Sequence, residues 1–406
     1  MADYFDDLEI RSEDERAEWL QSALPAAIGR AKTAPALARL LRDIDPAEIR
    51  DRNALAALPV IRKAELVDAQ KKNPPFGGYA TRLAAEFDHI FQSPGPIYEP
   101  GRRDGDWWRL GRFLYACGVR RGDIVQNCFA YHLTPAGMMF DSAARAVDAA
   151  VLPAGTGQTE LQVRAAADIG ATVYAGTPDF LKVILDRADE LGEKLSFKRA
   201  AVGGGALFPS LRSHYAERGI TTLQSYATAD LGNIAYESEA MEGMIVDEGV
   251  IVEIVRPGTG IPVPDGEVGE VVVTTLNPDY PLVRFATGDL SAVLPGVSPC
   301  GRTNMRIKGW MGRADQTTKI KGMFVRPEQV ASLVARHPEI TRARIIAERE
   351  GEMDMMIVQI ESPRDAADDY AGSIVEALKM KGRIQIVPPD SLPNDGLVIE
   401  DRRKYD

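Results

Sequence analysis

The chain has 406 residues, of which 45% are hydrophobic and 26% charged, a length and composition typical of a globular protein with two or three domains. Its formal net charge is −11 and its basic residues are scattered, which disfavours a nucleic-acid-binding surface. Three widely spaced cysteines and four histidines disfavour a disulfide framework and a zinc site.

The first ten residues, MADYFDDLEI, are acidic and lack the basic and apolar regions of a signal peptide. No apolar run approaches the ~18 residues of a membrane span. We therefore expect a cytoplasmic protein with no membrane partner.

The elements follow one another in three blocks. The spacing of apolar residues predicts helices over the first ninety residues. From about residue 105 the pattern alternates between helix and short apolar strand, which predicts a layered α/β domain with a largely parallel sheet. Between residues 244 and 276 the period changes to two, which predicts antiparallel strands or a small barrel. The last 90 or so residues mix helix and strand patterns.

These patterns predict an α/β fold with two parts. The first is a large N-terminal domain of several subdomains, residues 1–312, and the second is a small α+β C-terminal domain, residues 313–406. No internal repeat or low-complexity tract interrupts either part.

Common catalytic motifs are absent: there is no GxxxxGK[ST], no HExxH and no GxSxG. Polar stretches instead follow the predicted strands, at the sheet edge where open α/β folds bind ligands. They are GGGALFP at 203–209, SYATADLG at 225–232, RFATGDL at 284–290 and GRADQTTKIKG at 312–322. In the third, Asp289 is suited to gripping a vicinal diol with its carboxylate.

In their order and spacing, these stretches resemble the phenylacetate–CoA ligase family, a branch of the adenylate-forming acyl-CoA synthetases. The longest matching segments are VPDGEVGEVVVTTLNPDYPLVRFATGDL and GWMGRADQTTKIKGMFVRPEQV. ACGVRRGDIVQNCFAY, LPAGTGQTELQV and GTPDFL are similar to shorter family segments, so the resemblance covers nearly the whole chain.

The resemblance implies a nucleotide site. Tyr226 and the three glycines would line the adenine, Asp289 would bind the ribose hydroxyls, and Arg313 would lie beside the nucleotide. Asp230 would stand where the family has a glutamate that helps to hold Mg²⁺. The nucleotide-binding residues implied in this way are Ser93, Gly95, Gly203, Gly204, Gly205, Tyr226, Ala227, Thr228, Asp289 and Arg313.

The resemblance also implies the reaction and its partners. ATP would convert a small carboxylic acid to an acyl-adenylate, and CoA would then displace AMP, with Asp230, Arg313 and Asp315 as the catalytic residues. Asp315 would be the hinge of a mobile C-terminal domain in a homodimer. Phe129, Tyr131 and His132 would line the acyl pocket, although His132 could equally be a core histidine.

Two departures from the family concern the phosphates. FQSPGPIYEPG, residues 91–101, stands where the family has the hydroxyl- and glycine-rich SSGTTGKPT loop, and its three prolines have no N–H to offer. Leu397 follows Gly396 where the family has a catalytic lysine after its glycine. The groups that would handle phosphate are thus reduced, whereas those that would bind adenosine are kept.

Three hypotheses follow. The chain is an ATP-dependent acyl-CoA ligase for an aromatic or similar small acid, with Mg²⁺ and CoA. Alternatively, it is a non-adenylating homologue that binds AMP, an acyl-adenylate or acyl-CoA as a sensor or half-reaction protein. A third reading is an interaction protein with a vestigial pocket, marked by a large exposed apolar patch.

Overall fold

The computed structural model describes residues 3–314, 316–320, 323–350, 353–364 and 366–403. Contacts divide the chain into two compact units. Unit 1 comprises Met1–Val252, Val273–Phe285 and Leu294–Trp310, and unit 2 comprises Glu253–Val272, Ala286–Val293 and Met311–Asp406. The expected domain boundary at 312/313 stays a prediction, and the expected hinge, Asp315, lies outside the described residues.

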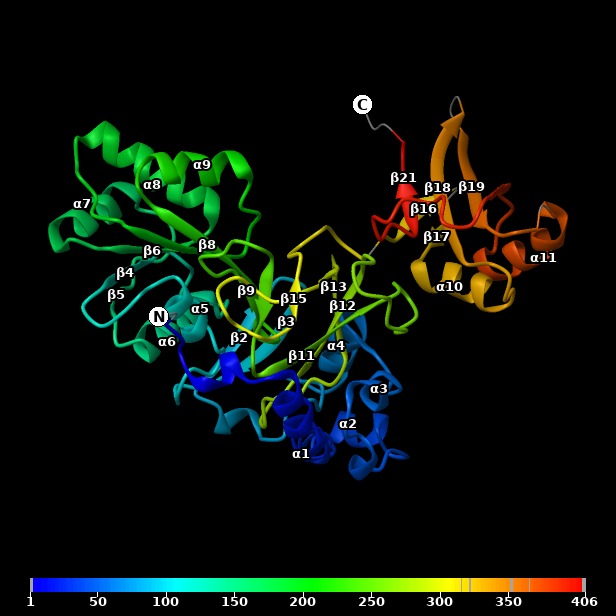
Figure 1. Ribbon diagram of the computed structural model, residues 1–406, viewed down its shortest axis with the longest axis horizontal. Coiled ribbons are helices and arrows are strands. Elements are labelled where there is room, and N and C mark those ends of the chain that lie inside the picture. The colour runs from blue at the N-terminus through cyan, green and yellow to red at the C-terminus, as the bar shows by residue number, and fades with distance from the viewer. Residues whose placement is uncertain (1–2, 315, 321–322, 351–352, 365, 404–406) are drawn as a thin grey trace. The chain divides into compact units, whose positions relative to one another are not determined.

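The N-terminal region is helical, as predicted (Figure 1). Its first long helix begins with a capping box, in which Ser12 and Glu15 satisfy each other's backbone N–H groups. The helical elements are η1 (Asp7–Ile10), α1 (Glu13–Ala31), α2 (Pro35–Leu40), η2 (Pro46–Glu48), α3 (Arg52–Ala56), α4 (Lys63–Lys72) and η3 (Ala84–Glu86). A short strand, β1 (Ile61–Arg62), directly precedes α4.

The predicted α/β alternation forms a nine-stranded sheet of order β14-β15-β10-β9-β8-β7-β6-β4-β5. Neighbouring strands from β5 to β8 pair in parallel, whereas β8, β9, β10 and β15 pair antiparallel. The strands are β4 (Ile124–Asn127), β5 (Ala150–Leu152), β6 (Val173–Gly176), β7 (Arg199–Val202), β8 (Thr221–Thr228), β9 (Gly232–Tyr236), β10 (Met244–Val246), β14 (Val293–Leu294) and β15 (Arg306–Ile307).

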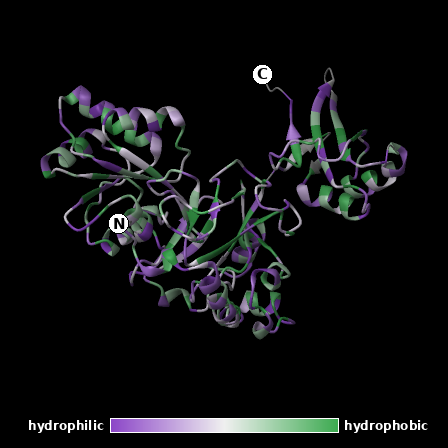
Figure 2. Cartoon of the chain, viewed as in Figure 1, coloured by the Kyte–Doolittle hydropathy of each residue, from purple (hydrophilic) through white to green (hydrophobic). Residues whose placement is uncertain are grey.

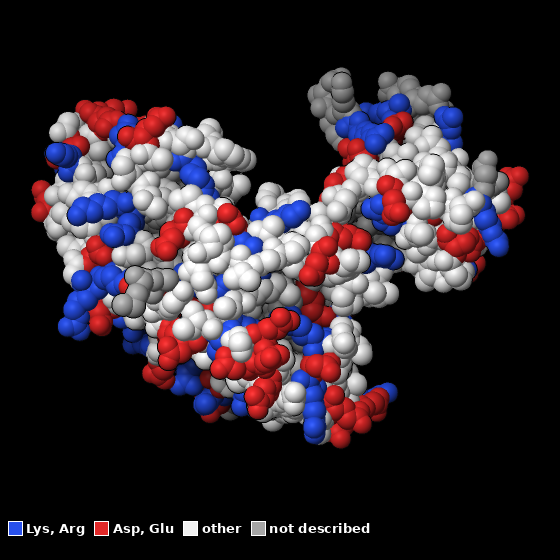
Figure 3. Space-filling view, viewed as in Figure 1, with Lys and Arg blue, Asp and Glu red and all other residues white. Residues whose placement is uncertain are grey.

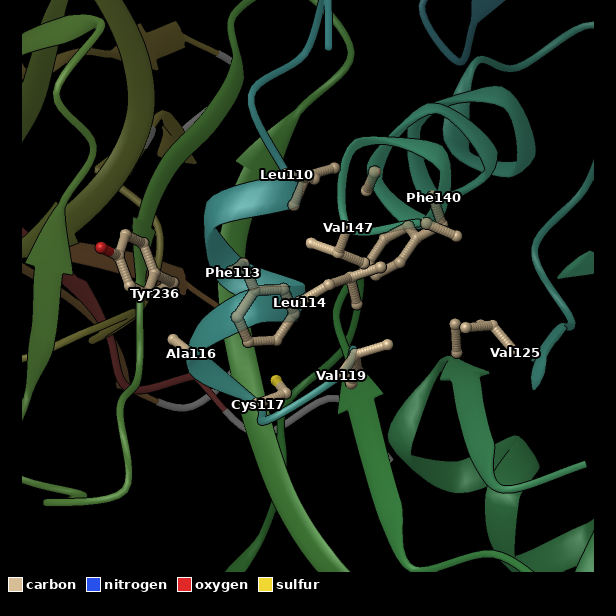
Figure 4. Close-up of a cluster of buried hydrophobic side chains, with 14 of the residues drawn as sticks. Leu110, Phe113, Leu114, Ala116, Cys117, Val119, Val125, Phe140, Val147 and Tyr236 are labelled. Carbon is tan, nitrogen blue, oxygen red and sulfur yellow. The ribbon is translucent and has the colours of Figure 1, made fainter. Parts of the chain in front are cut away.

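Four helices connect the parallel strands: α6 (Ala136–Ala146), α7 (Thr159–Ile169), α8 (Pro178–Leu191) and α9 (Pro209–Glu217). A further helix, α5 (Gly111–Ala116), precedes the first of these strands, β4. One buried cluster packs α5 and α6 against the sheet, with Phe113, Leu114 and Phe140 among its members (Figure 4). The three cysteines are all buried and free.

A two-stranded hairpin, β2 (His89–Ser93) and β3 (Ile97–Gly101), carries the unusual proline-rich stretch. Ser93 pairs with Ile97, so the turn consists of the three residues 94–96. The proline-rich stretch is therefore a tight hairpin.

The region of period two, residues 244–276, begins with β10, which belongs to the nine-stranded sheet. The rest of the region forms β11 (Val250–Val255) and β12 (Gly269–Thr275), and β13 (Phe285–Ser291) follows them. They join β1 in a four-stranded sheet of order β1-β13-β12-β11. Hydrophobic residues run along β11 and β12 (Figure 2). The polar residues that alternate with them, including Glu253 and Glu270, are buried too. The alternation of apolar and polar residues therefore does not mark a solvent-facing side of this sheet.

The predicted C-terminal α+β region consists of a hairpin, a four-stranded sheet and two helices (Figure 1). The sheet order is β20-β19-β18-β21, with β18 and β19 antiparallel and both outer strands parallel to their neighbours. The elements are β16 (Thr318–Ile320), β17 (Met323–Val325), α10 (Pro327–Ala335), β18 (Arg342–Glu350), β19 (Met353–Glu361), α11 (Ala367–Leu378), β20 (Arg383–Val387) and β21 (Ile399–Asp401).

Candidate functional site

The glycines 203–205 follow β7 at the carboxyl edge of the parallel strands, where the sequence predicts a ligand site. A Cβ atom at Gly203 would lie 3.1 Å from Ser225 Oγ, and Gly204 has a φ of +70°. A Cβ at Gly204 would lie 3.8 Å from the ring of Phe129. The structure thus brings Phe129 and these glycines together, and the close approach and positive φ explain the glycines.

Tyr226, Ala227 and Thr228 end strand β8. The pairing register with β9 shifts between Tyr226 and Ala227, which marks an irregularity in the ladder. Tyr226 is buried, and Thr228 Oγ1 accepts a hydrogen bond from Leu231 N at 3.2 Å, closing the turn that carries Asp230.

Asp230 is buried beside a cation that the sequence analysis missed. Lys63, the first residue of α4, places its Nζ 3.2 Å from Asp230 Oδ2. The Asp230 side chain is 1% exposed, and its Oδ1 has no hydrogen-bond partner among the described residues. Lys63 comes from far earlier in the chain, in VIRKAEL, so no local motif links the two residues.

Glu99 is a second buried acid that sequence reasoning missed. It lies on β3 and accepts a short hydrogen bond from Ser93 Oγ on β2. Burial, together with the nearby negative charge of Asp230, raises the pKa of Glu99 to about 8. The signal in the sequence was an acid within an otherwise uncharged strand, IYEPG.

Ser93 and Gly95 are placed in a hairpin that offers few donors. Ser93 Oγ is engaged by Glu99, and within the turn 94–96 only Gly95 has a backbone N–H. Gly95 adopts a φ of +153°, which favours glycine. The nucleotide contacts of Ser93 and Gly95 remain predictions.

The three expected acyl-pocket residues lie in different surroundings. Phe129 is 8% exposed and stacks on Phe140 with ring centroids 4.5 Å apart, so it is part of the core. Tyr131 is half-buried, and its hydroxyl accepts a hydrogen bond from Asn127 Nδ2 at 2.7 Å. His132 is exposed, which rules out the alternative of a core histidine.

In unit 2, Asp289 and Arg313 are brought together. Arg313 Nη1 donates to Asp289 Oδ1 at 2.8 Å, and the backbones of the two residues form an isolated β-bridge. A Cβ atom at Gly288 would lie 2.8 Å from Arg313 Nη2, and Gly288 has a φ of +75°. The sequence TGD therefore allows the guanidinium to approach a largely buried carboxylate.

Leu397 lies in the C-terminal segment 394–399. It lines a cavity of about 200 Å³ in unit 2, together with Val268, Val330 and Val334. The Leu397 side chain is apolar and offers no charge to a phosphate, and its correspondence to the family's lysine stays a prediction.

Among the described residues, no group of three or more His, Cys, Asp or Glu side chains could hold a metal ion by itself. Mg²⁺ in nucleotide sites is usually bound by one or two carboxylates together with substrate phosphates and waters. Asp230, with its unpartnered buried oxygen, fits that requirement. Across the part of the chain that the structure describes, no helix is long and apolar enough to span a bilayer.

Comparison with solved structures identifies the fold. The chain matches a 2-hydroxyisobutyryl-CoA ligase in its postadenylation state with a TM-score of 0.71 and 22% identity, covering 98% of this chain and 92% of that one. The same ligase in an open conformation with 2-HIB-AMP and CoA gives a TM-score of 0.72 at 21% identity, covering 95% and 91%. The fold is thus that of an adenylate-forming acyl-CoA ligase, as predicted.

The curated proteins that are similar in sequence are phenylacetate-coenzyme A ligases. The chain is 29% identical over 346 residues to a phenylacetate-coenzyme A ligase of Thermus thermophilus, covering 80% of this chain and 77% of the relative. It is 27% identical over 337 residues to that of Aromatoleum evansii, covering 79% and 75%. No family model matches the chain. The predicted resemblance to phenylacetate–CoA ligases is confirmed, and it supports the predicted enzyme class, an AMP-forming acid–thiol ligase.

Proposed function

We propose that this protein is an ATP-dependent acyl-CoA ligase that activates an aromatic or similar small carboxylic acid through an acyl-adenylate. The acid's carboxylate would attack the α-phosphorus of ATP and release pyrophosphate, and the thiolate of CoA would then displace AMP. The relatives named phenylacetate-coenzyme A ligase support this reaction class, and two compared structures carry acyl-AMP ligands, one of them with CoA.

The observation that carries the proposal is the pairing of Asp289 with Arg313. A carboxylate held in place by a guanidinium and a backbone bridge presents a fixed acceptor, which suits the two hydroxyls of a ribose. Arg313 is partly exposed, so its guanidinium can also face an anionic nucleotide. Neither feature is required by the packing of an ordinary turn.

Unit 1 carries the other residues for which the resemblance implies contacts with ATP and Mg²⁺. The glycines 203–205 leave room for the flat adenine, with Tyr226 near the same strand ends. Asp230 would hold Mg²⁺, which when bound neutralises charge on the phosphates. In this structure Lys63 forms an ion pair with Asp230. When Mg²⁺ binds, Lys63 would have to share the Asp230 carboxylate with the ion or release it.

Calorimetric titration with AMP and with Mg²⁺–ATP tests the nucleotide site without knowledge of the acid. The ligase proposal predicts that both bind and that AMP is formed when CoA and a panel of aryl and short-chain acids are added. A phenylacetate–CoA ligase assayed in parallel controls the conditions. If no acid in the panel yields AMP while the control enzyme forms it, the proposal is contradicted.

A second candidate, a non-adenylating homologue that binds AMP, an acyl-adenylate or acyl-CoA, is favoured by the tight hairpin. Its turn has one N–H group, and Ser93 is already engaged by Glu99. Loss of a single charged transition-state contact costs on the order of 10²–10³ in rate, so two such losses would leave little adenylation. Binding of AMP without Mg²⁺–ATP would support this candidate.

The substitution Leu397→Lys separates the two candidates further. A ligase that lacks only the lysine should adenylate its acid faster once the charge is restored. The non-adenylating candidate predicts no gain, because the hairpin still lacks donors for the phosphates. Leu397→Met serves as the matched control, since it changes the side chain's shape without adding charge.

A further inference from the structure

A cavity of about 340 Å³ in unit 1 has Tyr131 in its lining and none of the residues implied to bind the nucleotide. Its volume is at the lower end of the range for small-molecule sites. It is lined by His89, Arg102, Arg103, Trp108, Tyr131, Met138, Asp141 and Arg145. The lining therefore combines three apolar or aromatic side chains, which we call the apolar floor (Trp108, Tyr131 and Met138), with three arginines, one histidine and one acid. We call the arginines and the histidine the polar rim.

The apolar floor comes from two directions. Trp108 is 3% exposed and precedes α5, whereas Met138 lies on α6. Tyr131 contributes a ring whose hydroxyl is held by Asn127. Indole, phenol and thioether groups together suit a flat apolar body such as an aromatic ring.

The residues of the polar rim come from the β2–β3 hairpin and from α6. Arg102 and Arg103 directly follow β3, and His89 begins β2, so the open end of the hairpin contributes all three. Arg145 lies on α6 two turns after Met138 and one turn after Asp141, on the same face of the helix. Only one acid, Asp141, is among the residues that line the cavity.

The charges on the rim are not fully balanced. Asp279 and Asp104 engage Arg102 at 3.0 and 2.8 Å, and Asp141 lies 3.3 Å from Arg145. The guanidinium of Arg103 forms no ion pair with any residue that the structure describes, while its backbone N–H donates to Asp88. Although the chain has a net charge of −11, the Arg103 guanidinium is thus available to bind an added anion through two N–H groups.

We infer that the cavity holds a second anionic group, at the far end of the acid that the enzyme activates. The substrate class is thus a small acid with a flat apolar body and two anionic groups, one that reacts and one that Arg103 and Arg145 bind. This inference rests on the proposed function, because the link to the acid is Tyr131, one of the residues implied to contact the acyl group.

Calorimetry with a matched pair of acids tests the inference. 4-Carboxyphenylacetate and 4-carbamoylphenylacetate have nearly the same shape and differ by one negative charge. The wild-type protein should bind the dianion at least about tenfold more tightly than the amide, since bidentate arginine contacts to a carboxylate are strong. Equal affinity for the two compounds would overturn the inference.

Variants locate the effect. Arg103→Gln and Arg145→Gln should each reduce the preference for the dianion several-fold, and together they should abolish it. Arg121→Gln is the matched control, because that arginine is 84% exposed and pairs with Asp148 away from the cavity. A preference that survives in the double variant would place the anion elsewhere and overturn the inference.

An AMP titration of the same samples separates the two proposals. If AMP binds and the dianion has no advantage, the substrate class is wrong and the ligase proposal stands. If neither AMP nor Mg²⁺–ATP binds while the arginine-dependent preference is present, the ligase proposal fails, and with it the assignment of the anion to a substrate.

Discussion

Asp289 is the residue on which nucleotide binding is expected to depend most. Its carboxylate is 8% exposed and held by Arg313. Asp289→Asn keeps the shape but removes the charge and the bidentate acceptor. We expect AMP affinity to fall by about 10- to 100-fold, because hydrogen bonds to charged groups contribute about 1.5–3 kcal/mol. Calorimetry measures the loss.

The control for this variant is Asp265→Asn, a change of the same kind at an exposed position in unit 2. Thermal melting of both variants checks that they are folded. Unchanged AMP affinity in folded Asp289→Asn protein would remove Asp289 from the nucleotide site.

Glu99 makes the stability of the protein depend on pH. Its pKa is raised from 4.5 to about 8 in the folded state, chiefly by burial and next by Asp230. Between these values the unfolded chain releases a proton that the folded chain keeps, so stability contributed by Glu99 falls as the pH rises.

Glu99→Gln removes this dependence. We expect the variant to gain stability relative to the wild-type protein as the pH rises from 5 to 8, by on the order of 3 kcal/mol or several degrees in Tm. Melting curves across this range measure the gap, and Glu217→Gln, at an exposed position, is the control. A gap that stays constant or narrows would show that Glu99 is ionised in the folded protein.

At the scale of an element, one side chain makes three hydrogen bonds to the C-terminal segment that carries Leu397. Gln316 Nε2 donates to Gly396 O at 2.9 Å, and its Oε1 accepts from the N–H groups of Val398 and Ile399. β21 begins at Ile399 and pairs with β18, so this amide holds the edge strand and the preceding loop together.

Gln316→Ala should free this segment. Amide exchange at Val398 is expected to accelerate by about tenfold or more, because an unsatisfied buried group costs about 1–3 kcal/mol. Hydrogen exchange followed by mass spectrometry reports the rate in the peptide that contains it. Gln385→Ala, which removes a side-chain hydrogen bond from Gln359 on a different strand, is the control, and equal effects of the two changes would contradict this account.

At the scale of the whole molecule, residues far apart in sequence build unit 2. Val268, Leu290, Ala292 and Ala314 form one buried cluster, and Asn394 Oδ1 accepts a hydrogen bond from Val268 N at 2.9 Å. A Cβ atom at Gly396 would lie 2.7 Å from Val268, so the C-terminal loop packs closely there.

A fragment of residues 1–312 should therefore be less stable than the full chain. Removal of 313–406 exposes Val268 and Leu290, and burial of an aliphatic side chain contributes about 1.5–3 kcal/mol. We expect a lower Tm and stronger binding of a hydrophobic dye, with a chain shortened to residues 1–403 as the control. Equal Tm values for the fragment and the full chain would instead favour a boundary at 312/313.

Charge is distributed without a dominant sign on the face shown in Figure 3, where acidic and basic side chains are interspersed. The net charge of −11 comes from the whole chain rather than from one patch visible there. The expectation that the protein binds no nucleic acid stays a prediction, as does the homodimer. Analytical ultracentrifugation would test the latter.

The sequence by itself determined the class of fold, the order of helices and strands and the resemblance to acyl-CoA ligases. Period, capping residues and turn residues act over a few neighbours, so they can be read locally. The TGDL stretch likewise places Asp289 after a glycine that the structure requires.

Tertiary structure alone decided which side chains meet. Lys63 and Asp230 are 167 residues apart, and the hairpin brings Glu99 to Ser93 and His89 to the rim of the cavity formed with α6. The pKa of Glu99 follows from burial, and the apolar setting of Leu397 from residues throughout unit 2. Such effects depend on packing between distant segments, which no local pattern in the chain contains.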